Sequence, residues 1–125
     1  MSSKTKIIAE AGVNHNGSIE LAKELIHAAK ESGADIIKFQ TFKTELGITR
    51  STPLTPYQKR KSTKIETQYD LIKALELSFD DFSELKEYSE KLDIEFLSTA
   101  FDIPSLEFLY KIGINRFKIP SGEIT

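Results

Sequence analysis

Side chains capable of chemistry stand at or near the ends of four short apolar segments. The segments are KIIAEAG, DIIKFQTF, IEFLSTAF and NRFKIPSG, the last of which is followed directly by Glu123. The residues concerned are Glu10, Lys38, Gln40, Ser98, Thr99, Lys118, Ser121 and Glu123. Charged groups on otherwise apolar strands cost free energy unless they are paired or bind something. Their repetition in all four segments therefore indicates a shared site.

The cationic and hydroxyl side chains in this set are suited to an anion. Lys38 and Lys118 provide ammonium groups, and Thr99 and Ser121 provide hydroxyls. The backbone amide of Gly122 could donate a hydrogen bond to the same anion. Charge-assisted hydrogen bonds and a concave group of amides are how proteins bind phosphate and carboxylate. The sequence therefore predicts a phosphorylated substrate without naming a reaction.

Two carboxylates accompany the lysines. Glu10 and Glu123 could move protons or activate a water beside the anion site. A purely structural interpretation also stands, in which Lys38 pairs with a neighbouring acid and Lys118 pairs with Glu123. Such ion pairs are common in proteins that use them only for stability.

The four apolar segments are predicted to be strands of one parallel sheet. They lie at 6–12, 35–42, 94–101 and 115–122, and helical patterns lie between them at 18–33, 67–77, 78–92 and 104–113. Continuous apolar runs suit strands covered on both faces, and alternation of strands and helices indicates right-handed parallel crossovers. The carboxyl ends of parallel strands meet at one edge, where α/β folds bind ligands.

Local signals fix several helix ends. Ser18 is the expected N-cap of the first helix, with Leu21, Leu25, Ala28 and Ala29 on its buried face and Gly33 as its stop. Ser78 and Asp81 have the spacing of a capping box, and Pro104 suits a first helical turn. The polar stretch 43–66 fits no element and is expected to be either disordered or functional.

Composition excludes several classes of protein. The chain has 125 residues, no cysteine and a formal net charge of −2, with 17 basic residues interleaved among 19 acids. Disulfides and thiol catalysis are excluded, and neither a nucleic-acid partner nor a membrane surface is expected. No signal peptide or membrane span is recognisable, so we expect a cytoplasmic protein.

The two histidines are poor candidates for chemistry. His27 lies within the first predicted helix and is expected to be a surface or half-buried packing residue. His15 lies in the turn-forming run VNHNG, where a structural role is at least as well supported as a catalytic one. A metal site built from these two residues alone is not expected.

Three stretches closely resemble the N-terminal part of the sialic acid synthase family. They are IAEAGVNHNGSIELAKELIHAAKESGADIIKFQT, FLSTAFD and FKIPSGEIT, and the similarity is weakest over 43–66. The resemblance implies a (β/α)8 barrel, the TIM barrel fold, followed by an antifreeze-like domain. It also implies condensation of phosphoenolpyruvate with an N-acetylated amino sugar, such as N-acetylmannosamine, to a nine-carbon 2-keto acid and phosphate. KFQTF and STAFD look more like the legionaminate-type and general bacterial branches.

The resemblance also implies individual roles. Phosphoenolpyruvate would be held by Lys38, Thr99, Lys118 and Ser121. Gln40 would touch the sugar, and Glu10 and Glu123 would lie near the reacting carbons. A divalent metal, Mn²⁺ or Mg²⁺, serves the family, but its ligands lie on later barrel strands, so no metal ligand is expected within 1–125.

A complete barrel of this kind needs roughly 250 residues. We therefore expect 1–125 to be a partial barrel domain that is inactive alone, and we expect it to self-associate, as a homodimer for example. Two alternatives stay open: a related condensing barrel of the 3-deoxy-sugar-phosphate type, and a non-catalytic half-barrel that binds phosphate or serves assembly.

Overall fold

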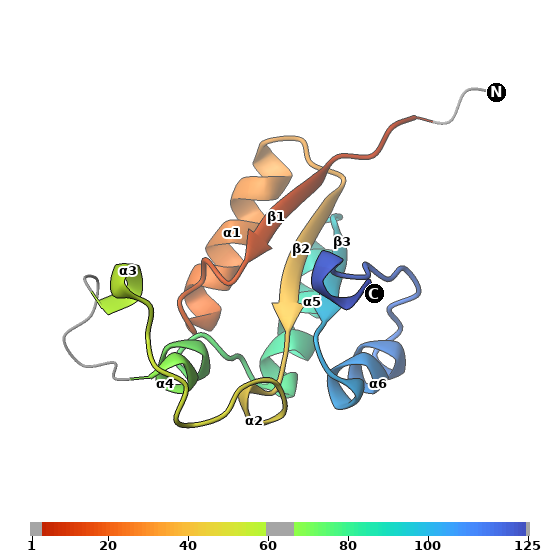
Figure 1. The fold of residues 1–125 in the computed structure, drawn as a ribbon. Coiled ribbons are helices and arrows are strands. Elements are labelled where there is room, and N and C mark those ends of the chain that lie inside the picture. Colours follow the sequence, from red (N-terminus) through yellow and green to blue (C-terminus); the bar gives the residue numbers. More distant parts are fainter. Residues whose placement is uncertain (1–3, 60–66, 125) are drawn as a thin grey trace.

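The computed structural model describes residues 4–59 and 67–124 (Figure 1). A three-stranded parallel sheet forms its centre, in the order β1-β2-β3. The strands are β1 (Ile8–Gly12), β2 (Ile36–Thr41) and β3 (Glu95–Ala100). The helices are α1 (Ile19–Glu31), α2 (Thr44–Gly47), α3 (Pro56–Lys59), α4 (Gln68–Lys73), α5 (Phe79–Lys91), α6 (Ile103–Lys111) and the 3-10 turn η1 (Ser121–Glu123). The predicted α/β class, with strand-helix units like the first units of a TIM barrel, is confirmed.

The predicted helix starts are also confirmed. Ser18 caps α1, and its hydroxyl accepts a hydrogen bond from the amide of Leu21 at 3.2 Å. Ser78 and Asp81 form a complete capping box at the start of α5. Gly33, with a φ of +85°, directly follows the C-cap of α1, where a left-handed residue lets the chain turn toward β2.

The main core lies between the sheet and the pair α1 and α5, which Figure 1 shows side by side on one face of the strands. Aromatic rings dominate it. Phe39 stacks on Phe96 with 5.7 Å between ring centroids, and Phe82 meets Phe96 edge-on at 6.5 Å. This packing uses the odd positions of β2, so the even positions, including Lys38 and Gln40, point to the opposite face.

The buried face of α1 matches the predicted one only in part. Ala29 is buried and Leu25 packs against the core, as predicted, but Leu21 is 40% exposed and Ala28 is exposed, while Ala22 and Ile26 are buried. The true stripe follows i, i+4, i+7 and is displaced by about one residue from the predicted stripe. Small residues at 22 and 29 let α1 lie close to the sheet and to α5, which the larger Leu21 would prevent.

The predicted fourth strand is not formed. Residues 115–120 run without a ladder, and Ser121–Glu123 form η1 instead. Every residue from 115 to 119 is exposed, and Arg116 anchors the segment through an ion pair with Glu95 at 2.8 Å. Within the described residues no further strand lies beyond this segment, so pairing with β3 would bury little apolar area to offset the entropy of ordering it.

The connection 43–66 is partly structured. Its described part contains α2 and α3, and Pro53 forms an antiparallel bridge with Thr67, just before α4. Residues 60–66 of this predicted stretch lie outside the described residues. None of the described helices has the length and apolarity needed to cross a membrane.

Candidate functional site at the strand ends

The end of β1 is shaped by a bulge. The register of β1 and β2 shifts between Glu10 and Gly12, and Gly12 has a left-handed φ of +54°. A Cβ at Gly12 would lie 3.1 Å from Glu10 Oε1 and 3.5 Å from Gln40 Nε2. A glycine here therefore provides both the backbone conformation and the room that the Glu10 and Gln40 side chains occupy.

Lys38 and Glu10 form an ion pair on the face of the sheet away from the core. They are register partners, and Lys38 Nζ lies 2.5 Å from Glu10 Oε2. The Lys38 side chain is only 15% exposed, whereas that of Glu10 is 49% exposed. Lys38 is thus a mostly buried cation held at a fixed point beside a carboxylate that water can reach. The ion pair that the structural interpretation predicted between Lys38 and a neighbouring acid is therefore present.

Gln40 and Thr99 form the next row on the same face. They are register partners across β2 and β3. Thr99 is 2% exposed, and its Oγ1 has no hydrogen-bond partner among the described residues. A buried hydroxyl without a partner is costly, so this atom is available to a ligand. Four of the predicted site residues, Glu10, Lys38, Gln40 and Thr99, are thus brought together.

Lys118, Ser121 and Glu123 are placed differently. All three are exposed, and in the described part of the chain none of their side chains forms a hydrogen bond or ion pair. Lys118 and Glu123 line one cavity of about 320 Å³, but they do not pair with each other.

This cavity reaches Ser98 and Ala100, which alternate with Thr99 along β3 and belong to the core-facing side. Ser98 bonds Thr41 there at 2.6 Å. Of the four strand ends expected to converge, three therefore place their site residues side by side on one face of the sheet, and the fourth does not. The physical reason is the missing ladder at 115–122, because without pairing no register fixes which way these side chains point.

A second cavity of about 250 Å³ opens at the carboxyl end of β2. Gln40 contributes to its lining, together with apolar side chains that follow β1 and β2, from the 43–66 connection, and from α4 and the turn after it. The lining residues include Val13, Gln40, Phe42, Ile48, Ile72 and Leu75. Phe101 and Asp102 line both cavities and so separate them.

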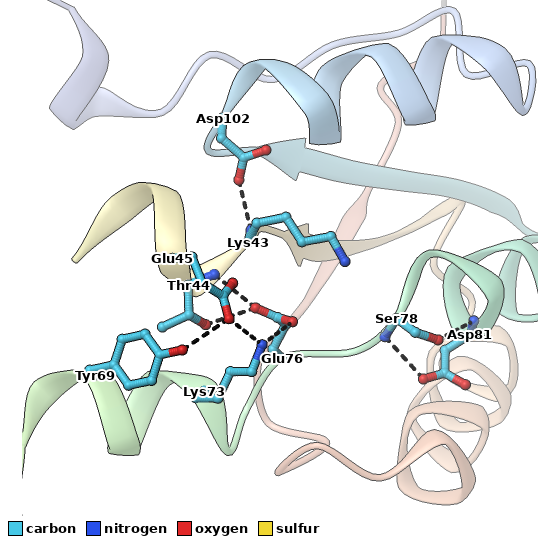
Figure 2. A network of polar contacts seen from close by, with 9 residues as sticks. All are labelled: Lys43, Thr44, Glu45, Tyr69, Lys73, Glu76, Ser78, Asp81 and Asp102. Carbon is cyan, nitrogen blue, oxygen red and sulfur yellow. Dashed lines mark hydrogen bonds and ion pairs between the residues drawn. The ribbon is translucent and has the colours of Figure 1, made fainter. Parts of the chain in front are cut away.

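A polar network, not predicted from sequence, fixes the wall of this second cavity (Figure 2). Glu76 Oε1 accepts hydrogen bonds from the amide and the hydroxyl of Thr44, both at 2.8 Å. Lys73 Nζ reaches Glu76 Oε2 at 3.0 Å and Glu45 Oε1 at 2.7 Å. Tyr69 donates its hydroxyl to the same Glu45 oxygen at 2.9 Å. The network ties α2 to α4; its one visible signal in the sequence is an acid inside the apolar run ALEL.

These contacts shift the ionisation of the network. The ammonium of Lys73, the backbone and the Tyr69 hydroxyl lower the pKa of Glu45 from 4.5 to about 2. Burial raises the pKa of Glu76, but the donors on Thr44 and Lys73 outweigh burial and lower it overall. Both carboxylates, in turn, raise the pKa of Lys73. All three groups are therefore charged at neutral pH, as a structural network requires.

The contacts of the two histidines are those of residues that support the fold. His27 is 55% exposed and lies 3.7 Å from Glu31 on the next turn of α1, as a surface residue. His15 is fully buried, its Nδ1 accepts the amide of Gly17 at 2.9 Å, and burial lowers its pKa. In the part of the chain that the structure describes, no group of three or more acidic or histidine side chains is arranged to hold a metal ion.

Comparison with known proteins gives consistent matches over most of the chain. It is 56% identical over 119 residues to the N,N'-diacetyllegionaminic acid synthase of Legionella pneumophila, covering 95% of this chain and 33% of that protein. It is 38% identical over 117 residues to the N-acetylneuraminate-9-phosphate synthase of Mus musculus, covering 94% of this chain and 32% of that protein. The chain thus spans about a third of the length of these relatives.

Solved structures agree. The crystal structure of N-acetylneuraminic acid synthetase from Leptospira borgpetersenii, in complex with citrate, matches with a TM-score of 0.72 and 34% identity. The match covers 94% of this chain and 36% of that one. A family model described as the NeuB family matches residues 25–125. These matches favour the sialic-acid type of synthase over the 3-deoxy-sugar-phosphate alternative, and the chain belongs to the NeuB family.

Proposed function

We propose that this chain supplies the phosphoenolpyruvate-binding strand ends of a synthase that joins phosphoenolpyruvate to an N-acetylated amino sugar, of the N-acetylmannosamine type. The product would be a nine-carbon 2-keto acid, with phosphate released. The observation that carries the proposal is the mostly buried Lys38 side chain, paired with Glu10 and one row from the unpartnered Thr99 hydroxyl. The synthase names of the relatives support it, and the Legionella pneumophila match favours a legionaminic-type product.

Lys38 and Thr99 would bind the anion. The Lys38 side chain is 15% exposed, and a charge near the protein surface that water screens less interacts more strongly with an anion. Thr99 Oγ1 can donate to a phosphate or carboxylate oxygen without giving up another bond. An arriving anion would share the Lys38 ammonium with Glu10 and would thereby lie directly beside the Glu10 carboxylate.

Glu10 would then act on the water or the proton. In the proposed reaction, carbon three of phosphoenolpyruvate forms a bond with the aldehyde carbon of the sugar, whose oxygen takes up a proton to become a hydroxyl, and a water oxygen adds to carbon two. The bond between carbon two and the phosphate oxygen breaks, so phosphate leaves and the 2-keto group forms. Glu10 is half-exposed beside Lys38, which suits a carboxylate that positions this water or accepts its proton.

We assign the remaining family roles to the 115–124 segment. Lys118 and Ser121 would add phosphoenolpyruvate contacts, and Glu123 would be the second acid. In the structure Lys118 and Glu123 line the adjoining cavity, so this assignment requires the segment to move toward the Lys38 face of the sheet. The divalent metal expected for the family, Mn²⁺ or Mg²⁺, does not fit any ligand group of the described residues, and no step is assigned to it.

A hybrid enzyme tests the proposal. This chain would replace the matching third of the Legionella pneumophila synthase, and keto acid and phosphate would be measured with phosphoenolpyruvate, the acetylated sugar and Mn²⁺. Lys38→Met should lower kcat/KM for phosphoenolpyruvate roughly tenfold to hundredfold, since charge-assisted hydrogen bonds contribute about 1.5–3 kcal/mol each. Lys91→Met, which alters a lysine that is 73% exposed, is the matched control. Full activity of the Lys38→Met hybrid would refute the proposed role.

The isolated chain is expected to show no turnover in the same assay. A chain that binds phosphoenolpyruvate but supports no hybrid activity would instead favour the non-catalytic alternative, a phosphate-binding or assembly module. We place the protein in the cytoplasm, where phosphorylated metabolites of this class are found, and expect self-association through the open edge of β1.

A further inference from the structure

The run VNHNG, which the proposed function does not use, forms a turn of a defined type between β1 and α1. The Ser18 amide donates to the His15 carbonyl at 2.9 Å, and the two residues between them, Asn16 and Gly17, have φ values of +53° and +77°. Two left-handed central residues are characteristic of a type I′ turn, which the pair Asn-Gly favours. The turn packs against the end of α4, and both can be followed in Figure 1.

The His15 ring holds this turn from inside the fold. The residue is fully buried, its Nδ1 accepts the Gly17 amide at 2.9 Å, and its ring centroid lies 6.1 Å from that of Phe39 in the core. A neutral ring that accepts at Nδ1 carries its proton on Nε2, and Nε2 has no hydrogen-bond partner among the described residues. Within that part of the chain, the side chain therefore contributes one hydrogen bond, and that bond goes to the turn.

Gly17 brings the backbone of the turn directly against the backbone of α4. A Cβ at Gly17 would lie 2.2 Å from the carbonyl oxygen of Ala74, the C-cap of α4, and 3.8 Å from Leu75 Cα. The first distance is shorter than real Cβ contacts, so a glycine meets both the left-handed φ and the close approach. The position of the turn therefore limits how closely the end of α4 can approach β1.

The end of α4 forms part of the wall of the 250 Å³ cavity. Ile72 and Leu75 line this cavity, and so does Val13, whose carbonyl accepts the amide of Asn16 in the turn at 3.1 Å. The network of Figure 2 ties α4 to α2, but these two helices lie at opposite ends of the 43–66 connection. The turn approaches α4 from a different part of the fold, the β1–α1 unit.

We propose that His15 is a positioning residue, whose hydrogen bond to the Gly17 amide holds the turn against α4 and so fixes the α4 wall of the cavity beside the strand-end site. It would touch no substrate. Burial, which lowers the pKa of the ring, keeps Nδ1 able to accept. Lys38 and Thr99 are placed by the sheet ladders, so His15 should affect the cavity side of the site and leave the anion side unchanged. The effect on turnover rests on the proposed function, whereas the effect on α4 does not.

Methyl NMR and amide exchange of the 125-residue chain test the hydrogen bond. His15→Leu removes the acceptor and keeps an apolar side chain. Exchange of the Gly17 amide should accelerate roughly tenfold, the effect of losing one hydrogen bond, and the methyl signals of Ile72 and Leu75 should shift. Those of Leu97 on β3 should not. His15→Asn provides an oxygen that can accept the same amide and should restore slow exchange. Equal effects of His15→Leu and His15→Asn would show that ring packing holds the turn, and would overturn the inference.

Two glycine variants test the contact with α4 from its other side. Gly17→Ala adds a methyl group for which the Ala74 carbonyl leaves no room, so it should shift the methyl signals of Ile72 and Leu75. Gly33→Ala is the matched control, because Gly33 has a similar φ of +85° and a Cβ there would meet nothing within 4 Å. If both variants shift the α4 signals equally, backbone strain and not the contact is responsible, and the inference is wrong.

The hybrid enzyme separates this inference from the proposed function. His15→Leu should lower kcat/KM for the amino sugar about tenfold to hundredfold, as small misplacements of bound groups do, and should leave KM for phosphoenolpyruvate unchanged. His15→Asn should recover most of the loss. Unaltered kinetics, or equal losses for both substrates, would refute the positioning role. If the parent hybrid shows no turnover, the proposed function fails, and the NMR comparison of His15→Leu with His15→Asn still decides whether His15 holds α4.

Discussion

Replacing Glu76 by alanine should destabilise the chain much more than its place beside a short helix suggests. Glu76 is the acceptor that holds Thr44 at the start of α2. Its side chain is only 11% exposed, and Thr44 is 2% exposed. Water therefore cannot easily replace the carboxylate when Glu76 is truncated.

The magnitude follows from the groups left behind. Glu76→Ala removes the acceptor from one buried amide and one buried hydroxyl, and each buried donor without a partner costs about 1–3 kcal/mol. The partner Lys73 is less affected, because its side chain is 43% exposed and it keeps Glu45 at 2.7 Å. We expect a loss of about 3 kcal/mol for Glu76→Ala. Glu76→Gln should lose about 1 kcal/mol, since its remaining oxygen can still accept from Thr44.

Urea unfolding monitored by circular dichroism measures these losses as shifts of the midpoint at constant slope. Hydrogen exchange at the Thr44 amide should accelerate in Glu76→Ala and stay slow in Glu76→Gln. Lys73→Met is the reference for the exposed part of the network and should cost less than about 1 kcal/mol. Equal destabilisation by Glu76→Ala and Lys73→Met would show that the ion pairs, not the bonds to Thr44, hold the network, and would refute the reasoning.

Four further outcomes are expected. Ser78→Ala should cost about 1 kcal/mol in urea unfolding through loss of the α5 cap, whereas Ser83→Ala on the exposed face of α5 should be near neutral. Because contacts lower the pKa of Glu45 from 4.5 to about 2, the stability it contributes should be complete above pH 4.5 and lost as pH falls toward 2, and Glu45→Gln should flatten that part of an acid titration. Because burial lowers the pKa of His15, nitrogen NMR should show its ring titrating below the ordinary histidine range, with the proton of the neutral ring on Nε2; titration at or above the ordinary value would contradict its burial. Size-exclusion chromatography with light scattering should show an assembly larger than a monomer, and a folded monomer at micromolar concentration would count against pairing at the β1 edge.

The sequence was sufficient where local chemistry decides the structure. Ser18, Ser78 and Gly33 could be placed because a cap or a left-handed turn depends on residues only a few positions away. The face of α1 was predicted only in part, because burial depends on α5 and the sheet, and apolar character alone does not distinguish Leu21 from Ile26. The space between α1, α5 and the sheet determines which side of α1 is buried, and that space cannot be read from the sequence.

The candidate site was predictable to the extent that parallel strands align it. Glu10, Lys38, Gln40 and Thr99 were expected together from the ends of apolar runs, and the ladders place them in two adjacent rows. The Thr44–Glu76 contact was not predictable, because it joins segments 32 residues apart with no shared pattern. Recognition of the 250 Å³ cavity depended on that contact as well, since it positions one wall.

The difference between Lys38 and Lys118 shows what a ladder contributes to a site of this kind. Both lysines occur in similar apolar runs, but only Lys38 has neighbours on both sides, Glu10 and Leu97, that fix its face and its depth. Lys118 lies in an exposed segment without a ladder and is not held at any defined distance from Lys38. Ordering this segment on binding would cost about 1–2 kcal/mol of backbone entropy per residue fixed. Whatever pairs residues 115–120 as a strand should therefore tighten anion binding at Lys38, and measuring phosphoenolpyruvate affinity in the chain and in the hybrid enzyme tests that coupling, because equal affinities would exclude it.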